Sequence, residues 1–137
     1  MRFIFIALLL VASTARAQSV IDGSAADIDP AIMKSALFEV TKELRDPVSA
    51  QARQVALIHP SQERPDVICG LINAKNGFGA YVGFKPFYYD VKMRSGGIVT
   101  DSPKDVGYRL QFLPLEWMGC DKQLGIKKPP PVRVPKH

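Results

Sequence analysis

The sequence predicts an α+β fold in which an N-terminal amphipathic helix packs on a small antiparallel β-sheet, with one disulfide. Three observations predict it: a helical apolar stripe just after residue 30, several short β-branched or aromatic segments behind it, and only two cysteines among 137 residues. A content of 47% apolar and 23% charged residues is typical of one globular domain. It excludes a fibrous chain and a wholly disordered one.

Residues 1–17 have the form of a secretory signal peptide. Arg2 precedes an unbroken apolar run over 3–12, and small residues end at Ala17, near which we expect cleavage. A helix of that apolar run would reach only about 15 Å, half of the hydrocarbon thickness of a bilayer, which disfavours a membrane anchor. We therefore expect an exported protein, periplasmic or secreted, with no transmembrane span in the mature chain.

The charge of the mature chain is mild. The full sequence carries a formal charge of +5, and removal of 1–17 leaves 16 Lys and Arg against 13 Asp and Glu, or +3. Nucleic-acid binding needs a stronger basic surface than this, so we expect no nucleic-acid partner.

The first half of the mature chain contains the clearest helix signal. Residues 18–28 are small and polar and predict a flexible leader. Asp29-Pro30 supplies a helix cap followed by a first-turn proline, and Asp46-Pro47 repeats that signal for one further turn. A helix over about 30–45 is predicted because apolar residues recur there at steps of three and four: Ile32, Met33, Ala36, Leu37, Val40 and Leu44.

The rest of the domain, predicted to span 29–123, has strand-like patterns. We expect strands over 53–59 and over 67–72, the latter as a central strand. The aromatic stretch 81–89 predicts either one strand broken by a bend or two short strands. Residues 91–94 continue in extended form, and Ser95-Gly96-Gly97 predicts a turn. Alternation of Tyr108, Leu110 and Phe112 predicts a half-buried strand, followed by a short helix or irregular segment over 115–120. Three consecutive prolines make 124–137 a Pro/Lys-rich disordered tail.

Cys69 and Cys120 are the two cysteines. In an oxidising compartment an even count favours a disulfide, over which Trp117 is expected to pack. A catalytic thiol would need a base, and neither His59 nor His137 lies in a suitable context. Paired metal-ligand spacing is also lacking. The sequence therefore predicts a Cys69–Cys120 disulfide and gives no candidate catalytic residue, metal ligand or cofactor site.

The segment around 73–88 is the most suggestive of binding. Its amides with a lysine could hold a phosphate or carboxylate, and its aromatic rings could stack on sugars or bases. Ordinary turn chemistry and core packing would use the same residue types, and the glycine spacing does not match a dinucleotide motif. Both interpretations stay open for the candidate ligand-binding residues: Asn73, Lys75, Asn76, Gly77, Gly79, Tyr81, Phe84 and Tyr88.

The same region carries a resemblance. Asp46-Pro47-Val48-Ser49-Ala50, followed by the run 69–84 that begins Cys69-Gly70 and ends Gly83-Phe84, resembles a group of small exported proteobacterial proteins with the motifs DP-x-SA, CG-x-[VI]-N-x-K-N and GG-Y-x-G-[FY]. The likeness covers about 45–90, and Ala80 stands where that group has glycine. It implies a periplasmic or cell-envelope protein and transfers no catalytic residue.

Together these observations favour a non-enzymatic binding or structural domain of the cell envelope. Its partner would be an envelope polymer or another envelope protein. The alternative is a small secreted hydrolase, or a hydrolase inhibitor, whose site depends on side chains that only folding brings together.

Overall fold

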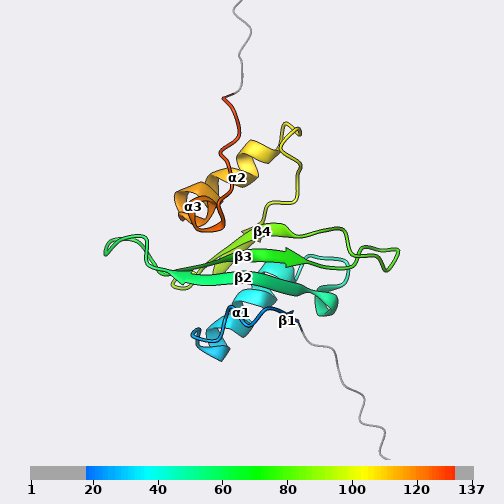
Figure 1. Cartoon of the computed structure of the whole chain (residues 1–137), viewed down its shortest axis with the longest axis horizontal. Coiled ribbons are helices and arrows are strands. Elements are labelled where there is room, and N and C mark those ends of the chain that lie inside the picture. The colour runs from blue at the N-terminus through cyan, green and yellow to red at the C-terminus, as the bar shows by residue number, and fades with distance from the viewer. Residues whose placement is uncertain (1–17, 132–137) are drawn as a thin grey trace, which may run out of the picture.

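The computed structural model describes residues 18–131 and has three layers (Figure 1). A five-stranded sheet forms the middle layer, with α1 against one face and α2 and α3 against the other. The α+β class is confirmed. The second helical layer was not predicted, and the predicted signal peptide lies outside the described residues.

The strands lie in the sheet in their sequence order, β1-β2-β3-β4-β5. All neighbours pair antiparallel except β1, which is parallel to β2, so the prediction of a purely antiparallel sheet is wrong. The extra strand comes from residues expected to be a flexible leader. The strands span Ser19–Val20 (β1), Gln51–Ile58 (β2), Val67–Asn73 (β3), Lys85–Asp90 (β4) and Ser95–Ile98 (β5).

Short polar side chains hold the rest of the leader along β2. The pairing of β2 shifts register after Arg53, and Gln54 there has a φ of 51°. The Gln54 amide donates to the Asp22 carboxylate over 2.7 Å, and the next amide of the strand donates to the Ser24 hydroxyl over 2.8 Å. These side chains occupy donors that a bulged strand edge would otherwise expose. The leader is therefore ordered, contrary to prediction.

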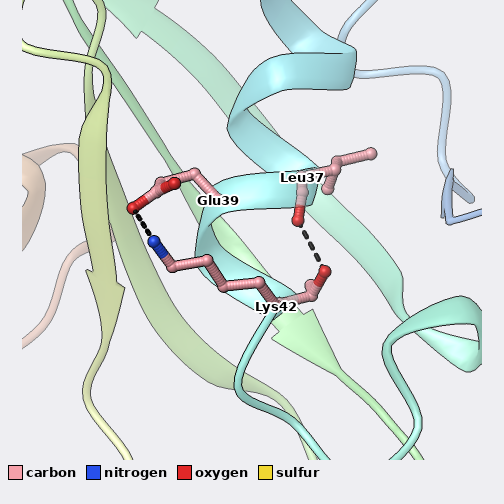
Figure 2. Close-up of polar contacts among 4 residues, drawn as sticks. Leu37, Glu39 and Lys42 are labelled. Carbon is pink, nitrogen blue, oxygen red and sulfur yellow. Dashed lines mark hydrogen bonds and ion pairs between the residues drawn. The ribbon is translucent and has the colours of Figure 1, made fainter.

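Helix α1 spans Pro30–Thr41 and begins at the predicted cap, where the Asp29 carboxylate accepts from two amides of the first turn. At the other end the Thr41 hydroxyl donates to the Leu37 carbonyl and accepts from the Gln18 side chain. Figure 2 shows this end, where Glu39 and Lys42 form an ion pair with a nitrogen–oxygen distance of 2.7 Å. The 3₁₀ turn Pro47–Ser49 (η1) follows, in agreement with the predicted extra turn.

Two hydrophobic cores lie on opposite faces of the sheet. Strand β3 contributes to both, since Ile68 is buried on the α1 side and Val67 and Cys69 on the other, which confirms the prediction of a central strand. Gly70 is needed on this strand: an added Cβ would lie 2.5 Å from a ring carbon of Phe87. The core under α2 and α3 consists of Val67, Cys69, Val99, Tyr108, Phe112, Leu115, Met118 and Cys120.

The segment predicted as a strand over 108–112 is helical. Helix α2 spans Tyr108–Trp117, and α3 spans Cys120–Leu124. Tyr108 and Phe112 satisfy the alternating pattern of a strand, but with Leu115 they also recur at steps of four and three, and these three side chains are the buried face of α2. The helical period prevails because that stripe covers the free face of the sheet.

The turn after β4 also differs from the prediction. Residues 91–94 form the turn instead of continuing in extended form, and Ser95–Ile98 is strand β5. The Asp90 carboxylate accepts from the Met93 amide over 2.8 Å, and Arg94 takes a φ of 50°. Gly96 belongs to the strand because a Cβ there would lie 2.4 Å from a β4 carbonyl and 3.0 Å from Val40 of α1.

The predicted disulfide is confirmed: Cys69 of β3 is bonded to Cys120 at the start of α3, with a Cα–Cα distance of 5.4 Å. Trp117 does not cover the bond. Its side chain is more than half exposed, and the Arg64 guanidinium lies 5.2 Å from the centre of its ring while donating to the Trp117 carbonyl.

The described part of the predicted disordered tail packs on α2. Ile126 contacts the α2–α3 core, Lys128 pairs with Glu116, and the Arg109 guanidinium donates to the Pro130 carbonyl over 3.0 Å. The prolines keep this stretch extended, and these contacts fix it against the helix. In residues 18–131, no helix has the length and apolar content that crossing a bilayer requires.

Candidate functional site

The loop between β3 and β4 projects from one end of the sheet, opposite the end that carries the β2–β3 connection (Figure 1). We call residues 73–84, which include Asn73 at the end of β3, the β3–β4 loop. Lys75 and Tyr81 form an isolated antiparallel bridge at its base, and the residues between them form the tip. Gly79 and Gly83 adopt φ values of 78° and 100°, which favour glycine over residues with side chains.

Two asparagine side chains fix the shape of the loop. The Asn76 side-chain oxygen accepts from the amides of Phe78 at 2.9 Å and Ala80 at 3.2 Å. The Asn73 side-chain oxygen accepts from the Gly83 amide at 3.0 Å. These three amides are therefore bound within the loop. This favours the turn-forming role of the asparagines over an amide nest for an anion.

Turn η1 is hydrogen-bonded to the β3–β4 loop. The Ser49 hydroxyl accepts from the Lys75 amide at 2.9 Å, and the Ser49 carbonyl accepts from the Tyr81 hydroxyl at 3.0 Å. The two segments that carry the sequence resemblance, 46–50 and 69–84, are thus in contact. Ser49 acts here through the backbone of the loop and its aromatic ring, a role that the sequence did not indicate.

The β3–β4 loop presents apolar surface to solvent. The exposed fraction is 98% for Phe78, 58% for Val82 and 42% for Tyr81. Phe78 was not among the predicted binding residues. Its position between Gly77 and Gly79 is the signal that could have identified it, because a side chain at the apex of a tight glycine-rich turn has no neighbouring layer to pack against.

Two of the aromatic rings have a cationic side chain close to them. The Lys75 ammonium lies 5.7 Å from the centre of the Tyr81 ring, and the Arg53 guanidinium lies 3.9 Å from the centre of the Phe84 ring. Contacts at these distances are cation–π interactions. Tyr81 and Arg53 are exposed, and Lys75 and Phe84 are partly buried. The loop therefore combines aromatic faces, aliphatic surface and positive charge.

Seven of the eight predicted binding residues lie in this loop: Asn73, Lys75, Asn76, Gly77, Gly79, Tyr81 and Phe84. Tyr88 does not join them. It lies further along β4 opposite Cys69 and Gly97, and packs against the α2–α3 core. Burial raises the pKa of Tyr88 above its ordinary value, in keeping with a structural role.

Three acidic side chains of the described residues pair with basic side chains at the surface. Glu39 pairs with Lys42, Glu116 with Lys128, and the Asp66 carboxylate lies 2.6 Å from Nδ1 of His59, with both side chains substantially exposed. Within 18–131 no three His, Cys, Asp or Glu side chains are grouped as a metal site requires. The chain matches no protein-family model, no curated protein and no solved structure.

Proposed function

We propose that this protein is a non-enzymatic binding domain of the cell envelope and that the tip of its β3–β4 loop is the recognition element. The observation that carries the proposal is the nearly complete exposure of Phe78 on a loop whose conformation is fixed. Large exposed apolar side chains grouped together on a surface are typical of interaction sites. Because the loop is ordered before binding, little conformational entropy is lost when a partner docks.

Export is part of the proposal. It is supported by the form of residues 1–17 and by the Cys69–Cys120 bond, since structural disulfides persist in oxidising compartments. The partner we favour is an envelope polymer that offers sugar rings and carboxylates, with peptidoglycan as the first probe. Aromatic faces stack on the apolar faces of sugars, and Lys75 and Arg53 supply the charge that carboxylates attract.

A sedimentation assay tests the proposal. Mature protein is incubated at low salt with insoluble peptidoglycan, with outer-membrane fractions and with inner-membrane fractions, and the pellets are quantified. We expect binding to peptidoglycan that Phe78→Ala weakens at least about tenfold, the effect of removing one anchor residue.

The matched control is Phe38→Ala. Phe38 is also an exposed phenylalanine, with an exposed fraction of 62%, but it lies on α1. It should bind as the parent does. Failure to sediment with any fraction, or equal losses for the two variants, contradicts the proposal. Recovery with a membrane fraction alone would instead direct attention to another envelope protein as the partner.

A further inference from the structure

Helix α2 is apolar on the face opposite the core as well as on the buried one. The outward side chains recur at steps of four, three and four residues; the last three lie on α2, and the first lies in the turn two residues before the helix begins. Their exposed fractions are 98%, 72%, 50% and 56%, in order, for the α2 stripe: Val106, Leu110, Leu113 and Trp117. A helix that packs on a sheet needs only one apolar face. The second apolar face is therefore typical of an interaction surface.

We infer that the α2 stripe is the interface of a homodimer in which two copies of α2 pack antiparallel about a twofold axis. The first argument is the spacing, which runs four, three and four residues and is therefore the same in both directions. With a twofold axis between Leu110 and Leu113, Leu110 of each copy lies opposite Leu113 of the second copy. It also brings Val106, just before the helix, toward Trp117 of the second copy, the ring beside which Arg64 lies. Such self-complementarity is what a twofold interface requires.

The second argument is charge. Arg109 and Glu116 lie seven residues apart on the same flank of α2, beside the stripe, with the segment 126–130 next to them. In an antiparallel pair, this flank of one copy runs beside the same flank of the other in the opposite direction. Within each copy Glu116 pairs with Lys128 and Arg109 donates to the Pro130 carbonyl. In the antiparallel pair, Arg109 of each copy comes near Glu116 of the second copy and adds a second cation to that ion pair.

The short length of the stripe disfavours a membrane surface as the partner. Helices that lie on membranes carry Lys and Arg along their polar face, which attract anionic lipid. Besides Arg109 and Glu116, the cations Lys128 and Arg64 contact α2, so charge alone does not separate a membrane from a second copy. The stripe, however, includes only four apolar side chains, which is short for stable insertion but matches the contact made by one pair of crossing helices.

Sedimentation equilibrium of the mature, disulfide-bonded chain tests the inference over about 1 to 500 µM, the range in which a modest interface of this kind dissociates. We expect a monomer–dimer equilibrium whose dissociation constant rises at least about tenfold in Leu110→Ser and in Leu113→Ser. Both positions are half exposed or more, so the monomer fold should tolerate the change, and circular dichroism checks this. Phe38→Ser, the same loss of an exposed apolar side chain on α1, should leave the equilibrium unchanged.

Cysteine crosslinking tests the geometry. Mixing Leu110→Cys with Leu113→Cys and oxidising should yield a crosslinked heterodimer faster than either variant alone forms a homodimer, because the axis lies between these positions. A monomer at every concentration overturns the inference, as does an equilibrium that Leu110→Ser does not affect. Preferential crosslinking of Leu110→Cys to itself also overturns it. The inference is also overturned if the protein is a monomer and uses the α2 stripe to bind vesicles of phosphatidylethanolamine and phosphatidylglycerol.

Discussion

Loss of the disulfide should separate the contribution of the covalent bond from that of the α2–α3 core. The perturbation is the double substitution Cys69→Ala and Cys120→Ala, which leaves no unpaired thiol. Both half-cystines are fully buried and are 51 residues apart in the chain. The bond joins the middle of the sheet to the start of α3, so it restrains the whole second helical layer.

The expected loss follows from the chain that the bond closes. A loop of this length in the unfolded state gives a stabilisation of about 4 kcal/mol in the chain-entropy model. That is a large part of the 5–15 kcal/mol that a domain of this size typically has. The hydrophobic contacts of Phe112 and Leu115 remain in the variant, so the helical layer should still form but open more readily.

Equilibrium unfolding in urea measures this difference. The parent and the double variant are followed by far-ultraviolet circular dichroism and by Trp117 fluorescence, and each free energy of unfolding is extrapolated to water. We expect a loss of about 4 kcal/mol, with amides of α2 exchanging faster than those of β3. A loss below about 1 kcal/mol would refute the reasoning, since the helical layer would then be held by packing alone.

Three further predictions concern the loop, the core and the leader. Asn76→Ala removes the acceptor of two loop amides and should speed their hydrogen exchange while lowering stability by about 1 kcal/mol; unchanged exchange would contradict the capping role. Gly70→Ala should cost about 2 kcal/mol or more in urea unfolding because of Phe87, whereas Gly77→Ala, which meets open space, should cost much less. Hydrogen bonds, led by the one from the Gln54 amide, lower the pKa of Asp22 to about 2. This carboxylate therefore stabilises the fold above pH 4 and loses that effect as the pH falls through about 2, so the parent and Asp22→Asn should converge in stability over this range.

The parts of the fold that the sequence predicted depend on local signals. Asp29 followed by proline marks the start of α1, and the apolar stripe behind it marks the buried face. The run Val67–Asn73 is apolar on both faces, which is possible only for a strand covered on both sides. The even count of two cysteines predicted the disulfide without any knowledge of the topology.

The parts that were not predicted depend on tertiary contacts. Strand β1 exists because Gln51 and Ala52 offer a free edge and because Asp22 and Ser24 reach amides some 30 residues away. No local pattern in 18–28 encodes these partners. The apolar residues of segment 108–112 fit both the period of a helix and that of a strand. The helix forms because its apolar stripe covers a face of the sheet that would otherwise be exposed.

The candidate site was predicted in composition but not in arrangement. The asparagines and glycines identified the loop, yet the support from Ser49 is a contact between segments 26 and 32 residues apart. Tyr88 was assigned to the site because it belongs to the same aromatic stretch. Its place within β4 directs it to the α2–α3 core instead.

Site-specific photocrosslinking in the native host tests the account most directly. A photoreactive phenylalanine analogue replaces Phe78 in one strain and the control residue Phe38 in another, and intact cells are irradiated. The account predicts a covalent adduct with an envelope component from position 78 and none from position 38. Adducts of equal yield from both positions, or none from position 78, would contradict the claim that this loop is where the protein binds.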